Sequence, residues 1–544
     1  MQFASKLLSG AFQSLISSFS VAYLAIFLPI CVLIYTLLPQ KYKKYLLLTA
    51  SYVFFFLISG KLVVYLFLST LSIHYFGIWL DRLQTLEKSQ LAAAPLELKK
   101  QIKSHCKHQQ IRVILLAVCL HIGVLAVLKY SPFFLQNINT LLFLCKAPFS
   151  LQIPNFLQPI GISFFTLQAV SYLMDVYKKK IPADDNLLRL GLFLAFFPQI
   201  VEGPICRYEQ TADKLWNAQQ IRYSNLLLGA QRILFGLFKK LLVADRLNLF
   251  VKNVFDKGAE NEGAVIAVAA IAYTIQLYMD FSGSMDAVLG SAQIFGIALP
   301  ENFERPFFSK TIPEFWKRWH ITLGTFFKDY IFFPLSMTRP MKKLTTAARK
   351  RLGNYYGPLI PGSIALFCVW FSNGLWHGAG WNYIFFGLYH FILILLGNLI
   401  TPVVRQLQAR LHVRAEALPY RIMQIFRTSV LVVIGELFFR ASGLSIGLKM
   451  FWKIFTDFRF SVLVDGSLFS YGIDPLDFCV VGIALCVVFG ISLLNEKGIC
   501  VRFWLSKQSI PVRWGLLYLL ILAIIVFGAY GIGYVPVDPM YANF

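Results

Sequence analysis

The residues best suited to chemistry lie between positions 272 and 390, where polar side chains interrupt an otherwise apolar sequence. Among them, His377 stands between two apolar runs and is followed by Gly378 and Gly380, which let backbone or an acyl chain approach closely. A neutral imidazole can accept a proton near pH 7, as a base acting on a hydroxyl group must. The residues alone leave two interpretations open: a general base, or a core histidine bonded to a neighbouring helix. The histidines that fit the second interpretation better are His74, His121 and His390.

A second polar segment, residues 280–286, carries two carboxylates and two hydroxyls within seven residues. Ionisable residues are costly inside a bilayer, so such a segment favours a functional site. Because Gly283 allows the backbone to bend, we expect a break between two helices here, with Asp280 and Ser282 lining a cavity. In the structural alternative, Asp280 caps the second helix and holds the break together.

A third segment, residues 311–333, combines dense charge with many aromatic side chains. Thr311 and Glu314 match a capping box, with Pro313 in the first turn, so a helix is predicted to begin here. Glu314 and Arg318 are then partners one turn apart. The segment is too charged to face lipid and too aromatic for a solvated loop, which favours a re-entrant or interfacial helix packed inside the protein.

The composition places these segments in a membrane protein. Of 544 residues, 57% are hydrophobic and 14% are charged, whereas soluble domains carry about 25% charged residues. The net charge of +24 does not indicate a nucleic acid partner, because the basic residues form short groups between apolar runs, as in cytoplasmic loops of membrane proteins. The nine cysteines form no CxxC pair and no nucleotide-binding motif occurs, so no disulfide framework, metal or bound cofactor is expected.

The apolar stretches, among them 160–177, 187–201, 263–279 and 286–299, predict one polytopic helical bundle of about 11 to 14 membrane spans, several of them short or broken. The basic groups at 41–44, 82–112, 178–180 and 497–513 are predicted to face the cytoplasm, so that both chain ends lie outside. The expected segments are an interfacial amphipathic helix at 1–20, N-terminal spans at 21–158 with a cytoplasmic loop at 82–112, a core at 159–400, C-terminal spans at 401–533 and an extracytoplasmic tail at 534–544.

The polar segments belong to a longer series of motifs between residues 159 and 390. The series comprises Pro159–Gln168 with Tyr172–Tyr177, Phe197–Pro204, Leu277–Gly283, Pro300–Phe303, Glu314–His320 and Leu375–Ala379. In this order the motifs resemble those of the membrane-bound O-acyltransferase (MBOAT) superfamily. They are most like the branch that holds the membrane subunits of alginate and peptidoglycan O-acetyltransferases. The coincidence of all these motifs makes the resemblance specific at the level of the superfamily.

The resemblance implies an all-α polytopic bundle with re-entrant and short helices around a central tunnel. His377 matches the family's invariant histidine, and His320 matches a second histidine that is often important for activity. An acyl thioester, from acetyl-CoA or an acyl carrier protein, would enter from the cytoplasm and the acceptor from the opposite face. The residues expected to line the tunnel are Asp280, Ser282, Asn373 and Trp376, of which the last three are candidates to stabilise the oxyanion.

The choice of branch depends on the C-terminal third. Phe438-Phe439-Arg440-Ala441 looks like a segment of the alginate-type proteins, whereas the D-alanyl transferases usually stop before it. The resemblance therefore implies O-acetylation of an extracytoplasmic polysaccharide or peptidoglycan, with an extracytoplasmic partner acyltransferase, at the bacterial cytoplasmic membrane and among its lipids. Ser284-Met285 and Pro334–Arg339 depart from the family pattern and leave donor and acceptor open. The alternatives are D-alanyl transfer from a carrier protein to teichoic acid, lipid acylation, and transport or lipid scrambling without chemistry.

The tail supports a separate hypothesis. The chain ends in Met540-Tyr541-Ala542-Asn543-Phe544, which looks like the terminus of proteins that serve exported acyl transfer. Tyr541 would then carry the acyl group as an ester before a partner transferase accepts it. The alternative is a short aromatic anchor at the membrane interface.

Overall fold

The computed structural model describes residue 20 and residues 22–530. Apart from Ser20, the predicted interfacial helix at 1–20 lies outside these described residues, and so does the tail with Tyr541. Within them the chain is helical, and the one β interaction is an isolated bridge between Phe303 and Trp319. Eight helical segments of the described chain are long and apolar enough to cross a membrane. The predicted class, an all-α polytopic membrane protein, is confirmed.

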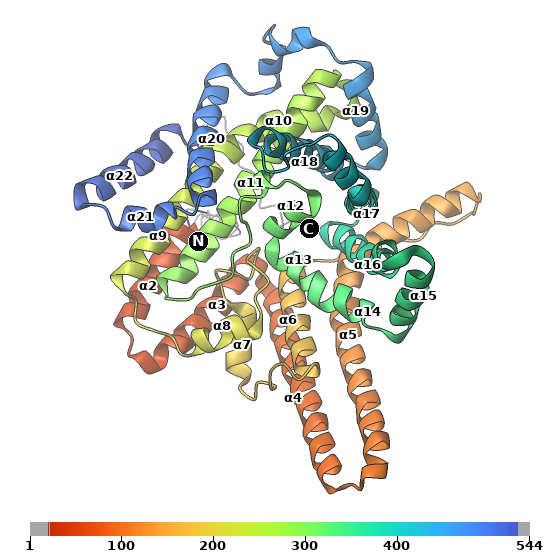
Figure 1. Cartoon of the computed structure of the whole chain (residues 1–544). Helices are drawn as coiled ribbons and strands as arrows, with labels where there is room; N and C mark the ends of the chain where they lie inside the picture. The colour runs from red at the N-terminus through yellow and green to blue at the C-terminus, as the bar shows by residue number, and fades with distance from the viewer. Residues whose placement is uncertain (1–19, 21, 531–544) are drawn as a thin grey trace. The chain divides into compact units, whose positions relative to one another are not determined.

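The described chain divides into two compact units, and the division falls inside helices α9 (Tyr223–Lys239) and α11 (Gly263–Ile294). The first unit holds the described residues up to 230 and residues 288–300. Its other elements (Figure 1) are the π-helix η2 (Ala22–Phe27), α2 (Leu28–Leu37), η3 (Gln40–Tyr42), α3 (Lys43–Ser59), η4 (Gly60–Leu62), α4 (Val63–Ala93), α5 (Leu96–Leu144), α6 (Ile162–Tyr177), α7 (Leu187–Ala195) and α8 (Tyr208–Trp216). The segment boundaries expected at 158 and 400 remain predictions.

The second unit holds residues 231–287 and the described residues from 301 onward. Its elements begin with the π-helix η5 (Lys240–Ala244), α10 (Asp245–Lys257), η6 (Gly258–Glu260), η7 (Pro306–Phe308), α12 (Ile312–Arg318), α13 (Ile321–Phe327), the π-helix η8 (Lys328–Phe332), α14 (Phe333–Ser336) and α15 (Arg339–Tyr356). They continue with α16 (Leu359–His377), α17 (Trp381–Arg410), α18 (Leu418–Arg440), α19 (Leu444–Thr456), η9 (Phe460–Leu463), η10 (Ser467–Tyr471), α20 (Pro475–Glu496), α21 (Val501–Ser506) and α22 (Ile510–Phe527).

Fewer helices have spanning length than the sequence predicted, for two physical reasons. The apolar stretches expected as separate spans at 263–279 and 286–299 belong largely to one helix, α11. The stretches expected at 160–177 and 187–201 form α6 and α7, which have 16 and 9 residues. A helix that crosses the hydrocarbon core needs about 20 residues. Eight helical segments of the described residues therefore reach spanning length, and α6 and α7 are among the short stretches that the expected 11 to 14 spans included.

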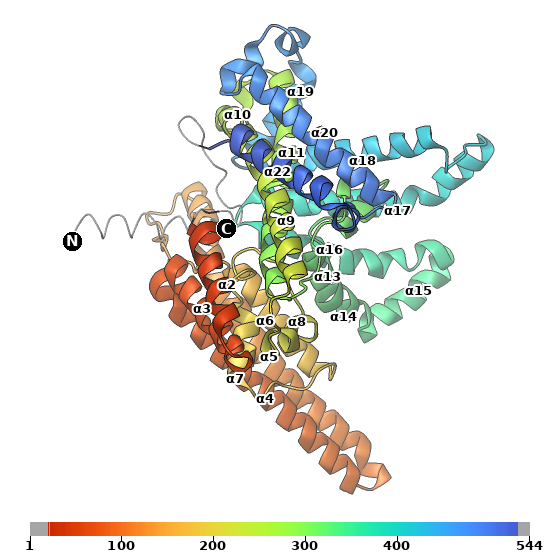
Figure 2. The same cartoon turned by 90° about the vertical axis from the view of Figure 1, so that its left-hand side faces the viewer.

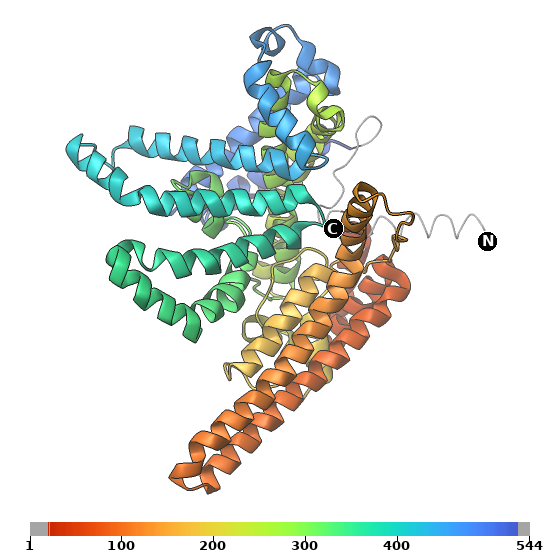
Figure 3. The same cartoon turned by 90° about the vertical axis from the view of Figure 1, so that its right-hand side faces the viewer.

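Helices α4 and α5 form a long hairpin in the first unit, visible in all three views (Figures 1, 2 and 3). The two helices are separated at Pro95, which cannot continue the first helix. The hairpin contains the loop expected at 82–112, but that loop is not wholly solvated. Glu87 and Gln110 are buried, and the Gln110 amide donates a hydrogen bond of 2.9 Å to the Glu87 carboxylate. Because Lys179 Nζ also lies 2.6 Å from Glu87, polar contacts fix one side of the hairpin.

Helix α11 runs without interruption through residues 280–286, so the predicted break at Gly283 is wrong. The polar side chains of this segment are instead satisfied by lysines at the end of α9. Lys239 Nζ lies 2.6 Å from Asp286 Oδ2 and donates to Ser282 Oγ at 2.9 Å. The glycine and the polar residues of this segment predicted a bend. The helix is instead continuous, because a lysine distant in the sequence pairs with its polar side chains.

Lys240, the first residue of η5, extends this buried cluster. Its Nζ lies 2.9 Å from Asp280 Oδ1 and 3.0 Å from Asp245 Oδ1. Asp280 therefore forms an ion pair in the middle of α11 and caps no helix, so the structural alternative for this residue is also wrong. Because unpaired charges are expensive in an apolar interior, these contacts fix α11 against α9 and η5.

Asp286→Asn removes the carboxylate that Lys239 shares with Arg232, whose Nε lies 2.8 Å from Asp286 Oδ1. Two buried cations then lose a partner, and we expect the free energy of unfolding to fall by about 3 kcal/mol. Thermal unfolding of the purified chain in detergent measures this as a lower melting temperature. The matched control is Asp256→Asn, since Asp256 is exposed on α10. Equal melting temperatures for both variants would contradict the structural role of the cluster.

Candidate active site

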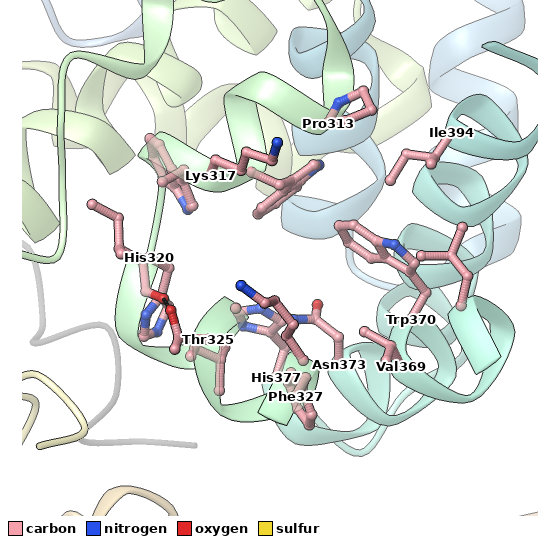
Figure 4. Close-up of a pocket in the computed structure, with 17 residues that line it drawn as sticks. Pro313, Lys317, His320, Thr325, Phe327, Val369, Trp370, Asn373, His377 and Ile394 are labelled. Carbon is pink, nitrogen blue, oxygen red and sulfur yellow. Dashed lines mark hydrogen bonds between the residues drawn. The ribbon is translucent and has the colours of Figure 1, made fainter. Parts of the chain in front are cut away.

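A cavity of about 340 Å³ lies in the second unit, lined by residues of α12, α13 and α16. Figure 4 shows His320, His377 and Asn373 around this space. All three residues are buried, with 3%, 6% and 7% of their surface exposed. The fold thus brings the His320 imidazole to the imidazole and carboxamide that His377 and Asn373 present one turn apart on α16.

Asn302 holds His320 in a strained backbone conformation. His320 has a φ of 48°, in the left-handed region that costs a residue with a side chain about 1–2 kcal/mol. Asn302 Oδ1 accepts hydrogen bonds from the Thr322 amide at 3.1 Å and hydroxyl at 2.9 Å, and His320 Nδ1 lies 3.3 Å away. Because a carboxamide oxygen only accepts, Nδ1 carries the proton of the neutral ring and Nε2 keeps its lone pair.

Aromatic rings surround both imidazoles. The Phe281 ring of α11 lies 5.0 Å from the His320 ring, edge to face. The Trp376 indole lies 5.5 Å from the His320 ring and 5.0 Å from the His377 ring. Burial lowers the pKa of His320 to about 3, so its imidazole is neutral at physiological pH. Trp376 is therefore in contact with both histidines, although it does not itself line the cavity.

Helix α16 presents one face to the cavity. Its lining residues follow helical spacing and are Leu366, Val369, Trp370, Asn373 and His377. His377 is the last residue of this helix, and its ring also contacts Phe439 of α18 at 5.2 Å. The same helix therefore supplies the imidazole, the carboxamide and an apolar wall.

Helices α16 and α17 cross closely at two glycines. A Cβ at Gly374 would lie 2.5 Å from the Tyr383 carbonyl oxygen, and one at Gly387 would lie 2.3 Å from a carbonyl oxygen of α16. A Cβ at Gly378, in the turn between the helices, would lie 2.3 Å from the Tyr383 ring. The group that approaches Gly378 closely is therefore an aromatic ring, whereas the sequence suggested backbone or an acyl chain. These contacts position the last turn of α16.

The structure does not bring every predicted residue to this cavity. Ser282 and Asp280 do not line it, because Lys239 and Lys240 engage them on another face of α11. His121 lies 3.3 Å from the Ser72 hydroxyl in the first unit, as expected of a core histidine. The two α11 residues thus contribute to the position of the helix and not to the cavity wall.

Other lining residues were missed by the sequence reasoning. Lys317 and Lys328 line the cavity, and no carboxylate does among its described lining residues. Trp316 also lines it, and its Nε1 donates to His390 Nδ1 at 3.2 Å, so that core histidine supports the wall. One signal was available, since Lys317 lies in the same motif as His320, the segment Glu314–His320. In the described part of the chain, no cluster of three or more His, Cys, Asp or Glu could hold a metal ion.

Comparison with known proteins identifies the family. A model described as "MBOAT, membrane-bound O-acyltransferase family" matches residues 184–348, which include His320 but not His377. The protein named "Probable alginate O-acetylase AlgI" from Pseudomonas syringae pv. tomato is 30% identical, over 87% of this chain and 81% of the relative. The chain belongs to the membrane-bound O-acyltransferase family.

Two further relatives of this MBOAT protein differ in what their names say they modify. The peptidoglycan O-acetyltransferase of Helicobacter pylori is 32% identical over 62% of this chain and 63% of the relative. The teichoic acid D-alanyltransferase of Bacillus subtilis is 32% identical over 45% of this chain and 60% of the relative. The chain is therefore a multi-pass membrane O-acyltransferase, and the alternative of transport without chemistry does not account for these similarities.

Gly387→Ala tests the crossing that positions α16 in this MBOAT protein. Its Cβ would lie 2.3 Å from a backbone carbonyl oxygen, so the helices must separate, and we expect about 2 kcal/mol lower stability. Gly397→Ala, on the same helix with nothing within 4 Å, is the matched control. It should be neutral or stabilising by up to about 1 kcal/mol, because alanine favours helix. The measurement is the melting temperature of each variant in detergent. A Gly387→Ala variant that melts at the wild-type temperature would refute the close crossing.

Proposed function

We propose that this acyltransferase moves an acetyl group from a cytoplasmic thioester, acetyl-CoA or an acyl carrier protein, toward an extracytoplasmic polysaccharide or peptidoglycan. One observation carries the proposal: the buried residues His320, His377 and Asn373 line one cavity of about 340 Å³. Cavities that hold small molecules begin at about 300 Å³, so a thioester group and an acceptor hydroxyl fit together here. Two bases and a carboxamide around one apolar space are the groups that acyl transfer to a hydroxyl requires.

In the proposed reaction, His377 is the general base. Its imidazole takes the proton of the acceptor hydroxyl while the hydroxyl oxygen attacks the thioester carbonyl. Collapse of the tetrahedral intermediate breaks the carbon–sulfur bond, and the imidazolium returns the proton to the departing thiolate. His320 is neutral and lines the same cavity, where its ring orients the acceptor beside His377.

Asn373 is the proposed oxyanion donor. Asn373 lines the cavity, and its Oδ1 atom is buried without a hydrogen-bond partner among the described residues. In the proposed role, the side-chain amide N–H groups donate to the negative charge that develops on the carbonyl oxygen. Of the residues suggested from sequence for this role, Ser282 is bonded to Lys239 and Trp376 lies beside the cavity.

Lys317 and Lys328 are the proposed contacts for the donor. Both are exposed at the cavity, and the described residues of its lining include these two lysines and no carboxylate. The phosphates of coenzyme A and of the phosphopantetheine arm of a carrier protein are the anionic parts of the proposed donors, and ammonium groups attract them. The charge of the lining thus supports an anionic thioester donor.

The extent of the similarities favours O-acetyl transfer over D-alanyl transfer. The alginate relative aligns with 87% of this chain, whereas the D-alanyltransferase aligns with 45%. We therefore assign the acyl group as acetyl, the membrane as the bacterial cytoplasmic membrane, and the final step to an extracytoplasmic partner acyltransferase.

His377→Ala should lower ester-linked acetate in the cell envelope by about 10²–10⁴-fold, the contribution of a general base. The measurement is release of ester-linked groups by mild base from cells with equal membrane levels of the protein, and identification of those groups by mass. His121→Gln is the matched control, a buried histidine away from the cavity. Loss of D-alanine would support the teichoic acid alternative, and unchanged esters would refute the role of His377.

The proposal for Tyr541, which lies outside the described residues, is an acyl relay on the extracytoplasmic side. Its phenol oxygen would attack the thioester, release the thiol and hold the acetyl group as an ester for the partner. Tyr541→Phe keeps the ring and removes only the hydroxyl, so we expect envelope acetylation to be lost. Mass spectrometry of the C-terminal peptide should find one added acetyl group in the wild type. Wild-type acetylation by Tyr541→Phe would exclude the relay and favour an aromatic anchor.

A further inference from the structure

A second cavity, of about 420 Å³, lies in the second unit away from the histidines. It is lined by the end of α9, by η5 and by α20, α21 and α22. Every described lining residue is apolar, and representative ones are Phe238, Leu242, Val487, Trp504, Leu520 and Ala523. A lining without polar groups offers water no partners, so the natural occupant is apolar.

The cavity exists because α22 is attached to the unit mainly at one end. The Ala529 amide donates to the Leu241 carbonyl at 2.9 Å, and Arg246 donates to the Phe527 carbonyl. Along α22 itself only Leu517 and Ile524 are buried. Figure 1 draws this helix at the left-hand edge, and Figure 2 shows it across its length. The gap beside α22 is therefore not filled by side chains of the described chain.

Arg513 is a basic residue in the first turn of α22, close in sequence to the residues of this helix that line the cavity, although it is not itself a lining residue. It precedes Leu516 by three residues and Leu520 by seven, which puts it on the face of α22 that lines the cavity. Its Nε atom is buried and has no hydrogen-bond partner among the described residues. Trp504 lies in the cavity wall, and tryptophan is typical of the level where lipid head groups begin.

We propose that this cavity binds one acyl chain of a membrane phospholipid whose phosphate is held by Arg513. The apolar wall matches the chain, and a guanidinium binds phosphate in a bidentate manner. A transmembrane helix of a partner protein fits less well. Such a helix is about 10 Å wide and 30 Å long, or about 2,400 Å³, several times the volume of the cavity. This site is independent of the acyl-transfer proposal.

The experiment uses the full chain, purified in detergent, delipidated and then incubated with dioleoyl phosphatidylglycerol. Native mass spectrometry counts the bound lipid, and a phosphatidylglycerol with a diazirine in its acyl chain maps contacts after illumination. We expect one retained lipid, with crosslinks on α20, α21 and α22. Arg513→Gln should weaken binding by about fivefold, the contribution of one cation at a lipid head group.

Two pairs of variants separate this site from general association with lipid. Ala523→Trp fills the cavity and should abolish retention, whereas Ile525→Trp, on the exposed face of α22, should not. Arg405→Gln, at an exposed position on α17, is the control for Arg513→Gln. If Ala523→Trp does not fold, lipid retention by Arg513→Gln still tests the proposal. Equal retention by wild type and Arg513→Gln, crosslinks away from these helices, or a co-purified protein crosslinked to α22 in place of lipid would each overturn the proposal.

Discussion

The ion pairs that Lys239 and Lys240 form with Asp286 and Asp280 are the constraint on which the site depends. Buried charges are tolerated only when they are paired, so α11 can take one register against α9 and η5. A shift by one residue would leave a carboxylate and an ammonium unpaired. The π-helical turn η5 begins at the second lysine and also brings Asp245 to 3.0 Å from it. The ion pairs thereby fix the register of α11, which apolar contacts alone would leave free to shift along α9 and η5.

The position of His320 follows from this register. Phe281 is adjacent in sequence to Asp280, and its ring contacts the His320 ring at 5.0 Å. Asn302, which also contacts Met285 of α11, supplies the hydrogen bonds that keep the loop around His320 in place. A left-handed backbone at a histidine persists only when its surroundings determine it. The backbone strain at His320 is thus offset by contacts with Phe281 and Asn302. The position of Phe281 depends in turn on the ion pairs of α11 with the buried lysines.

Local features of the site could be predicted from sequence, and long-range ones could not. The Thr311 hydroxyl accepts from the Glu314 amide at 3.2 Å and Glu314 pairs with Arg318 at 2.9 Å, because capping and one-turn spacing are properties of a short segment. The straight course of α11 was missed, because its charges are satisfied by lysines about 40 residues earlier in the chain. The lining residues between 366 and 377 follow helical spacing, which predicts that they share one helix face. Only the structure shows that this face lines the cavity.

The cavity at the histidines and the cavity beside α22 differ in the way that their proposed roles require. An acyltransferase must favour an acceptor hydroxyl over water, which would hydrolyse the thioester. The cavity at His320 and His377 meets this need with imidazoles that are at most 6% exposed and with walls of tryptophan, phenylalanine and leucine. Among its described lining residues the charged ones are lysines at exposed positions, which can hold an anionic donor. In the cavity beside α22, none of the described lining residues could take a proton, so that cavity can fill with hydrocarbon but cannot support this chemistry.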